Sequence, residues 1–270
     1  MPFLNTPEAK LFYVQSGAGP DIVWIPGGDS VATDWEEQFR AFEGQYRNTS
    51  FDPRGAGETV SHREPPWLIE DFAEDCAALI RVVCRPPVVL VGLSMGSLIV
   101  VQLALDHPEL VRTAITMGVS GRAEGFLMDW LKAEVEFRRE GGRLSRDFAV
   151  CHYASFMYPP AVLNNPALWA QVKPIVDRIY GARDGDALAA QWQACIEFDA
   201  TSRLPTCTVP LHVIAFSEDL QAPPEQGKRV AELAPRGYFH LLDGLGHVSL
   251  AGHQPSQVIA CIRQILDTPG

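Results

Sequence analysis

The sequence predicts an α/β fold in which a mostly parallel central sheet is covered by helices on both faces and interrupted by a helical cap. Short, continuously apolar runs alternate with amphipathic helical patterns up to residue 117, and this alternation is typical of βαβ units. Strand signals stop between residues 121 and 205, where helical, aromatic-rich segments take over. They return at residues 209–216 and 238–242, so the two outer parts of the chain should share one sheet.

The first part of the chain should supply most of this sheet. Apolar runs that predict strands lie at residues 11–14, 21–25, 48–51, 88–93 and 111–117. Apolar residues recur at helical spacing at residues 35–42, 69–83 and 98–105. Ligands of such sheets bind at the carboxyl ends of the strands, so the residues that follow each strand are the candidates for a functional site.

The predicted cap contains four helical segments. They cover residues 126–139, 148–157, 168–180 and 187–198, and Gly- or Pro-containing stretches, including residues 181–185, separate them. Most of their aromatic side chains should form a small core, and the others should face an apolar site above the sheet. The chain therefore divides into an α/β core of residues 1–120 and 206–270 and an inserted cap of residues 121–205. After the cap, the pattern ends with helices near residues 230–233 and 255–266.

The run VVLVGLSMGS at residues 88–97 carries the functional prediction. A buried strand ends at Gly-Leu-Ser-Met-Gly, and a helical pattern resumes at Leu98. In a nucleophile elbow, a sharp turn presents the serine above the sheet, and glycines at positions such as Gly92 and Gly96 let strand and helix pack closely. The amide of Met95 would then be free to donate to an oxyanion. The alternative is a glycine-flanked turn with an ordinary serine at Ser94, and the strand before it and the helix after it argue against that alternative.

Asp219 and His247 each follow a later predicted strand, so the order along the chain is serine, acid, histidine. A serine hydroxyl needs a base to take its proton, and a histidine serves because its pKa lies near neutral pH. A carboxylate then fixes the tautomer of the imidazole. Glu218 and Asp243 are alternative acids. Of the other histidines, His240 would lie within a strand and His253 beyond the loop, near the last helix.

These motifs resemble those of the α/β-hydrolase family, and the resemblance spans nearly the whole chain. GLSMG at 92–96 resembles the family's elbow, FSED at 216–219 with Pro223 its acid loop, and GLGH at 244–247 its histidine loop. The compact layout is similar to that of enol-lactonases, aminoacrylate hydrolases and small carboxylesterases. The resemblance implies a catalytic triad of Ser94, Asp219 and His247.

The segment after the strand at 21–25 departs from the family pattern. The family usually carries His-Gly there and donates a second oxyanion hydrogen bond from the next residue, whereas this chain has Pro26-Gly27-Gly28. The resemblance makes Gly28 the matching donor beside Met95. A second glycine-rich turn, DPRGAG at 52–57, lacks the Lys-Ser/Thr of a phosphate loop, so a structural turn fixed by Asp52 and Arg54 is favoured.

Composition limits the partners that can be expected. The net charge of −11 argues against nucleic acid or an anionic membrane. The six cysteines contain no Cys-x-x-Cys pair, so reduced core thiols are favoured over disulfides or a metal site, and neither a metal nor a cofactor is expected. The N-terminal residues lack a secretory signal, and no run is long enough for a transmembrane helix, so we expect a cytoplasmic protein. The sequence does not decide the oligomeric state, and both a monomer and a homo-oligomer are compatible with it.

The resulting hypothesis is a serine hydrolase that acts on a small ester, lactone or related acyl compound. The same triad would also serve a carbon–carbon bond hydrolase or a cofactor-free perhydrolase or haloperoxidase. An alternative from another class is a ligand receptor on this fold that does not turn its ligand over. Arg122 and Arg138 could hold a substrate carboxylate, although a position in solvent is the commoner role of such arginines.

Overall fold

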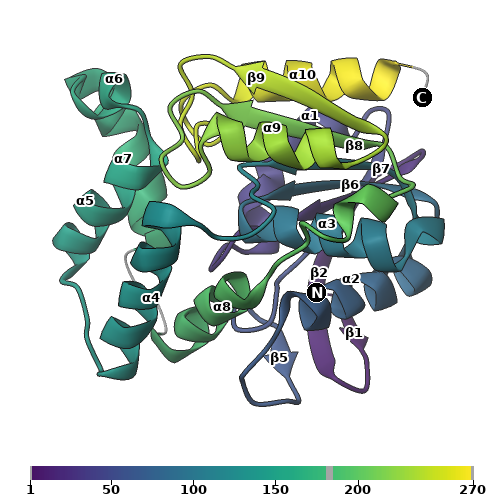
Figure 1. Cartoon of the computed structure of the whole chain (residues 1–270), viewed down its shortest axis with the longest axis horizontal. Coiled ribbons are helices and arrows are strands. Elements are labelled where there is room, and N and C mark those ends of the chain that lie inside the picture. Colours follow the sequence, from purple (N-terminus) through teal and green to yellow (C-terminus); the bar gives the residue numbers. More distant parts are fainter. Residues whose placement is uncertain (1, 181–184, 269–270) are drawn as a thin grey trace.

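The computed structural model describes residues 2–180 and 185–268, and in that part of the chain a nine-stranded sheet runs through the centre (Figure 1). The strand order is β1-β2-β4-β3-β6-β7-β8-β9, and β5 pairs with β2. The strands are Phe3–Asn5 (β1), Ala9–Gly17 (β2), Asp21–Ile25 (β3), Arg47–Phe51 (β4), Val60–Ser61 (β5), Val88–Leu93 (β6), Val111–Met117 (β7), Leu211–Phe216 (β8) and Gly237–Leu242 (β9). From β4 to β9 all neighbours are parallel, while β2 pairs antiparallel with β1, β4 and β5. The predicted, mostly parallel sheet is confirmed.

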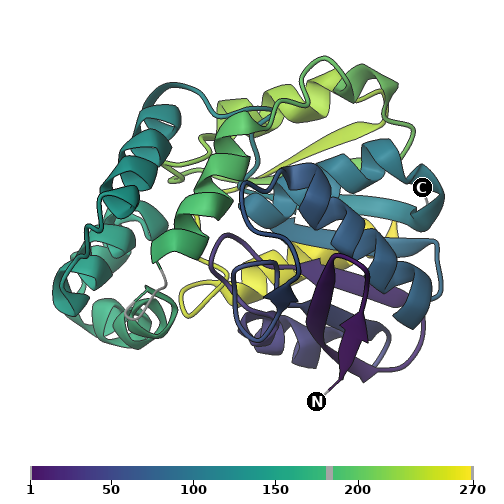
Figure 2. The same ribbon diagram turned by 90° about the horizontal axis from the view of Figure 1, so that it is seen from below.

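Helices cover both faces of the sheet (Figures 1 and 2). The helices on one face are Ile69–Val83 (α2), Met95–Asp106 (α3) and Pro224–Leu233 (α9), and those on the other are Glu36–Phe42 (α1) and Pro255–Asp267 (α10). Val88 and Leu90 of β6 belong to the apolar core under α2 and α3, whereas Val89 and Val91 belong to the core under α1 and α10. Successive residues of a strand point to opposite faces, so the unbroken apolar run of β6 reflects burial on both sides.

Among the described residues, five α-helices lie between β7 and β8 and form what we call the α4–α8 segment. They are Gly125–Arg139 (α4), Arg146–Met157 (α5), Pro160–Leu163 (α6), Pro166–Tyr180 (α7) and Gly185–Glu197 (α8). In both views they gather beyond one end of the sheet, with α8 nearest to it. The ring centroids of Trp130 and Trp192 lie 5.8 Å apart and join α4 to α8. The four predicted helical segments are present; of the predicted break at 181–185, residues 181–184 lie outside the described residues, and the division into two domains stays a prediction.

Three details differ from the sequence-based expectations. The short strands β1 and β5 were not expected, because three and two residues give no usable alternation of apolar and polar side chains. The helix after the elbow begins at Met95 instead of Leu98. Short 3-10 turns occur at Ala32–Trp35 (η1), Pro108–Leu110 (η2) and Leu204–Thr206 (η3).

The turn at residues 52–57 is structural, as expected. Asp52 accepts the backbone amides of Ala32 at 2.7 Å and Glu58 at 2.8 Å, so its carboxylate ties the turn to the residues that follow β3. Arg54 is buried and forms a two-pronged ion pair with Asp75 of α2. These contacts fix the turn beside the end of β4.

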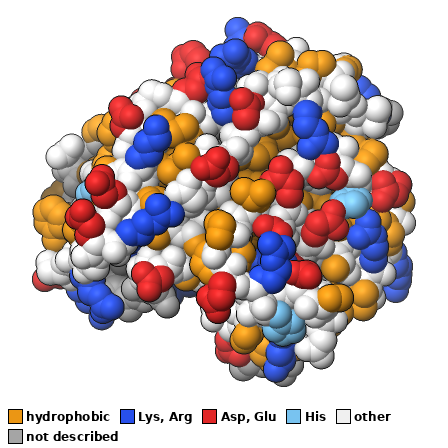
Figure 3. Space-filling view, turned by 60° about the horizontal axis from the view of Figure 1, so that its bottom comes forward, with side chains coloured by type: hydrophobic (Ala, Val, Ile, Leu, Met, Phe, Trp, Pro, Cys, Tyr) orange, Lys and Arg blue, Asp and Glu red, His pale blue; other side chains and the backbone are white. Residues whose placement is uncertain are grey.

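The six cysteines are free thiols. Four of them are buried, as expected of core thiols, but Cys151 is exposed. Within the described residues, no helix has the length and apolar content needed to cross a membrane, and no group of three or more His, Cys, Asp or Glu side chains is arranged to hold a metal ion. On the face shown in Figure 3, acidic and basic side chains are interspersed, and its described part carries no continuous basic patch.

Candidate active site

Ser94 sits in a sharp turn between β6 and α3. Its backbone has φ 56° and ψ −124°, a positive φ that is uncommon for a residue with a side chain. A Cβ atom on Gly92 would lie 2.4 Å from the carbonyl oxygen of Gly96, and one on Gly96 would lie 2.2 Å from the carbonyl oxygen of Ile25. Only glycine at these two positions therefore lets α3 start so close to β6 and β3. The geometry is that of the predicted nucleophile elbow.

Ser97 holds this turn through backbone hydrogen bonds, a role that was not predicted from the sequence. Its Oγ is fully buried and lies 2.8 Å from the carbonyl oxygens of both Gly92 and Met117. The same Oγ accepts the Met117 amide at 2.9 Å, and the Ser94 amide donates to the Met117 carbonyl at 2.9 Å. These bonds fix the elbow to the end of β7.

The structure brings Asp219 and His247 together from the loops after β8 and β9. His247 Nδ1 lies 2.7 Å from Asp219 Oδ2, and the two side chains are 3% and 0% exposed. The second carboxylate oxygen, Oδ1, accepts the amides of Gln221 and Ala222 at 2.9 Å each. Because the carboxylate can only accept, the neutral imidazole carries its proton on Nδ1, and Nε2 holds the free lone pair.

Gly118, directly after β7, makes room for this pair and was missed at the sequence level. It has φ +59°, and a Cβ atom there would lie 2.8 Å from Cε1 and 2.9 Å from Nδ1 of His247. It would also lie 3.3 Å from Asp219 Oδ2. A glycine that directly follows a buried strand is the signal that could have identified the position.

Ser94 and His247 line one small cavity, of about 40 Å³. Its apolar walls come from α3 and from the α4–α8 segment, through Leu98, Leu127, Leu131, Trp192 and Cys195. His247 Nε2 is buried and has no hydrogen-bond partner among the described residues. A cavity needs about 10–15 Å³ to hold a water molecule, so this one has room for a few waters or a small acyl group.

The competing candidates lie elsewhere. Glu218 and Asp243 are exposed, while Asp219 is the acid bonded to His247. Arg122 is bonded to Glu124 and close to Asp199, and Arg138 is bonded to the buried Glu134. Neither arginine lines the Ser94 cavity. The arrangement therefore offers no support for these arginines as holders of a substrate carboxylate.

Of the two predicted oxyanion donors, Met95 lines the cavity and Gly28 does not. A Cβ atom on Gly27 would lie 3.4 Å from the Cβ of Ser94, so the loop of residues 26–29 passes directly beside the elbow. Gly28 packs against Trp192, since a Cβ atom there would lie 2.3 Å from Cζ3 of the ring. Helix α8 therefore presses on the loop that carries the predicted donor.

Gln191 of α8 also holds this loop and was not predicted. It is fully buried; its Oε1 accepts the Asp29 amide at 2.7 Å, and its Nε2 donates to the Arg54 carbonyl at 2.7 Å. Asp29 has φ 60°, so the loop adopts an unusual backbone conformation where Gln191 binds it. The glutamine thus links the loop after β3 to the turn after β4.

We expect Gln191→Leu to damage both folding and catalysis. It removes the acceptor of one buried amide and the donor to one buried carbonyl, which should lower the free energy of unfolding by about 1–3 kcal/mol. A shift of the loop should also lower kcat about tenfold. Gln193→Leu on the same helix, where the side chain makes surface contacts to Arg139 and Glu197, is the matched control. Equal stability and activity in the two variants, by urea unfolding and ester turnover, would contradict this role.

His212 and His240 form a separate pair on β8 and β9. Nδ1 of His212 lies 3.0 Å from Nε2 of His240. Burial, and secondly the neighbouring His240, lowers the pKa of His212 from 6.5 to about 4, and burial also lowers the pKa of His240. As the pH falls below 6.5, the unfolded chain takes up a proton before the folded chain does, so stability is lost between about pH 6.5 and pH 4.

We therefore expect His212→Gln to make folding less sensitive to acid. Between pH 7 and pH 5 the variant should lose about 1 kcal/mol less unfolding free energy than the wild type, a value discounted because His212 is only partly buried. Urea unfolding at the two pH values measures the difference. An identical loss in both proteins would show that His212 titrates alike in the folded and unfolded states.

Comparison with known proteins places this geometry in context. Residues 22–260 match the model of a family described as the alpha/beta hydrolase family. A protein of Mycobacterium tuberculosis, provisionally named non-heme bromoperoxidase BpoC, is 28% identical over 244 residues, which cover 88% of this chain and 91% of that protein. A protein of Variovorax paradoxus, provisionally named carbamate hydrolase RutD, is 25% identical over 256 residues, covering 92% and 91%.

Solved structures show the same architecture. The crystal structure of BpoC superposes with a TM-score of 0.89 at 25% identity and covers 95% of each chain. The enol-lactonase of Burkholderia xenovorans superposes with a TM-score of 0.88 at 20% identity, over 99% of this chain and 100% of the other. At this identity the second likeness concerns the fold alone.

Proposed function

Because the chain belongs to the alpha/beta hydrolase family, we propose that it is a serine hydrolase that cleaves a small carboxylic ester, lactone or related acyl compound. The observation that carries the proposal is the 2.7 Å contact between Asp219 and His247, with the free Nε2 of His247 buried at the cavity that Ser94 also lines. A buried ring nitrogen without a partner is costly for stability, and a base that must accept a serine proton needs it.

The proposed reaction has two stages. His247 Nε2 takes the Ser94 proton as Oγ attacks the substrate carbonyl, and the resulting imidazolium is stabilised by Asp219. His247 then gives that proton to the leaving oxygen, so an alcohol departs and an acyl-enzyme remains. In the second stage His247 takes a proton from water, the hydroxide oxygen attacks the acyl carbonyl, and Ser94 regains its proton as the acid departs.

The tetrahedral oxyanion would be bound by backbone amides. The Met95 amide lies at the N-terminus of α3, where the helix dipole also favours negative charge. We assign the second amide to Gly28, on the loop that passes beside Ser94. One such donor contributes about 3 kcal/mol to lowering the barrier.

The cavity supports a small acyl group. Its volume of about 40 Å³ and its leucine, tryptophan and cysteine walls suit a short apolar chain and no charged one. We therefore propose faster turnover of p-nitrophenyl acetate than of p-nitrophenyl octanoate. Release of p-nitrophenol by the wild type, together with its loss in Ser94→Ala, is the test.

The same assay separates this enzyme from a receptor on the same fold. Turnover that disappears in Ser94→Ala supports the hydrolase. Ligand-dependent thermal stabilisation of the wild type without turnover of any ester would instead favour a receptor.

The BpoC likeness favours a cofactor-free perhydrolase as the second candidate. Acetic acid would acylate Ser94 with loss of water, and hydrogen peroxide would replace water in the second stage. Attack of the peroxide oxygen on the acyl-enzyme would release a peracid, which oxidises bromide, and Ser94 would regain its proton. Bromination in the presence of acetate and hydrogen peroxide, lost in Ser94→Ala, would support this activity. Ester hydrolysis without any bromination would exclude the perhydrolase and support the hydrolase.

A further inference from the structure

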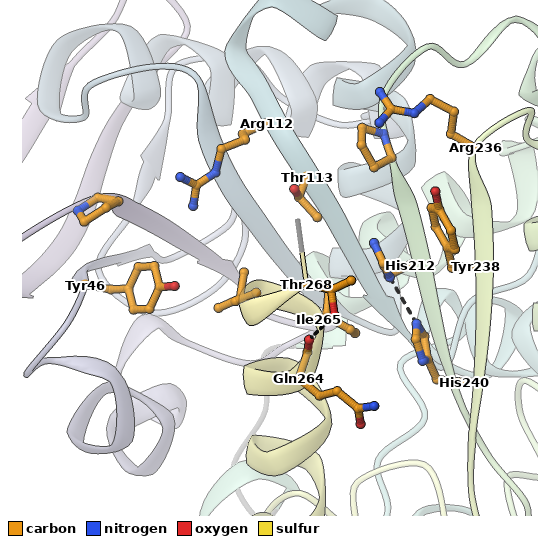
Figure 4. A pocket seen from close by; sticks show the side chains of 13 residues that line it. Tyr46, Arg112, Thr113, His212, Arg236, Tyr238, His240, Gln264, Ile265 and Thr268 are labelled. Carbon is orange, nitrogen blue, oxygen red and sulfur yellow. Dashed lines mark hydrogen bonds between the residues drawn. The ribbon is translucent and has the colours of Figure 1, made fainter. Parts of the chain in front are cut away.

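A second and much larger hollow lies at the opposite end of the sheet from Ser94. It has a volume of about 710 Å³. Its walls come from the first residues of β7, β8 and β9 and from the C-terminal turn of α10 (Figure 4). The elbow follows the carboxyl end of β6, and the parallel strands begin at the other edge of the sheet. We call this hollow the strand-start groove; its size is that of a typical small-molecule site.

Two unpaired arginines lie in the strand-start groove. The guanidinium groups of Arg112 and Arg236 form no hydrogen bond or ion pair with any described residue. Among the described residues that line the groove there is no aspartate or glutamate, although the whole chain carries a net charge of −11. Two guanidinium groups without a carboxylate present donors that match a carboxylate or phosphate.

The wall beside the arginines is aromatic. The rings of Tyr238 and His212 stack with centroids 4.6 Å apart and planes 14° apart, because residues 212 and 238 are paired in the parallel ladder of β8 and β9. His240 continues the stack at 5.3 Å and 18° from His212. Burial keeps the pKa of both histidines low, so near neutral pH they are uncharged rings. Tyr46 lies across the groove from this stack.

We propose that the strand-start groove binds a planar aromatic compound that carries a carboxylate or phosphate group. The ring packs against the Tyr238–His212–His240 stack, and the anionic group pairs with Arg236 beside it. Figure 4 shows Arg112 on the other side of Thr113 from Arg236, so its guanidinium group adds positive charge at the opposite wall of the groove. The groove is separate from the proposed catalytic cavity.

Calorimetric titration tests the proposal on the full chain carrying Ser94→Ala, so that binding is not followed by turnover. Phenyl phosphate and benzoate are the probes. Two compounds serve as controls: inorganic phosphate, which lacks the aromatic ring, and benzyl alcohol, which lacks the charge. We expect at least one of the two probes to bind with a Kd below about 1 mM. The inorganic ion and the neutral alcohol should each bind about tenfold more weakly or worse. No saturable binding of either probe, or equal binding of benzyl alcohol, would overturn the proposal.

Variants locate the site. The pair Arg112→Gln and Arg236→Gln should weaken binding of the probe at least about tenfold, and Tyr238→Ala should weaken it by several-fold. The pair Arg143→Gln and Lys173→Gln, exposed cations outside the groove, removes the same charge and should leave the Kd unchanged. When the same arginine substitutions are made in the protein that keeps Ser94, turnover of p-nitrophenyl acetate should equal that of the wild type. This result would show that the variants fold. Equal loss of affinity in the control pair would overturn the assignment to this groove.

Discussion

Asp219→Asn is expected to lower kcat by about 10⁴-fold with no change of fold. An asparagine oxygen can still accept the amides of Gln221 and Ala222, so the loop keeps its shape. Its side-chain NH2 group would donate a hydrogen bond to Nδ1 of His247. Because Nδ1 must then be the acceptor, the proton of the neutral imidazole moves to Nε2. The ring would then offer no lone pair to Ser94, and the imidazolium would lose its counter-charge.

The neighbouring carboxylates are the matched controls for that result. Glu218→Gln and Asp243→Asn change exposed side chains on the same two loops and should leave kcat within about twofold. Circular dichroism and thermal unfolding check that all three variants fold. An active Asp219→Asn protein, or a large loss in either control, would move the acid role to another carboxylate.

Gly28→Ala is expected to lower kcat by about 10²–10³-fold, the cost of losing one oxyanion donor. The new methyl group would lie 2.3 Å from Cζ3 and 2.6 Å from Cη2 of the Trp192 ring, so either the loop or α8 must move. Because the loop passes beside Ser94, a displaced amide no longer faces the developing oxyanion. The free energy of unfolding should fall as well, which urea unfolding measures.

A second substitution shows whether the collision with Trp192 is the cause. Trp192→Leu removes the ring, so adding it to Gly28→Ala should recover part of the lost kcat relative to the Trp192→Leu enzyme alone. Gly44→Ala is the control, because a Cβ atom there has nothing within 4 Å. If the fold-losses of kcat in the two single variants simply multiply in the double variant, the methyl group does not lower kcat by colliding with the Trp192 ring.

The sequence predicted best those elements whose local pattern and tertiary burial agree. The apolar run before Ser94 reads as a strand because both of its sides are buried, and the observed bounds of α2, Ile69–Val83, are those expected from its apolar spacing. The glycines of the elbow could be identified because strand and helix meet there at backbone distance.

Contacts between distant segments could not be read in this way. Gln191 is one of several polar residues in a helical pattern, and only folding brings it to Asp29, 162 positions away. The position of Gly118 after a buried strand is visible in the sequence, but the need for a glycine there comes from the packing of His247 against it. The i,i+4 spacing of Glu134 and Arg138 is compatible with an ion pair on the predicted helix, but the burial of that pair, which removes Arg138 as a candidate for binding substrate, could not be read from the spacing. The strand-start groove likewise depends on a register between β8 and β9 that no local pattern specifies.

The proposed activation of Ser94 as a nucleophile is tested most directly by the intact mass of the protein after treatment with a fluorophosphonate. Attack by Ser94 Oγ on phosphorus would displace fluoride and leave one phosphonyl group on the protein. We expect one adduct on the wild type and none on Ser94→Ala. A folded wild type that gains no adduct, or a Ser94→Ala protein that gains the same one, would contradict it.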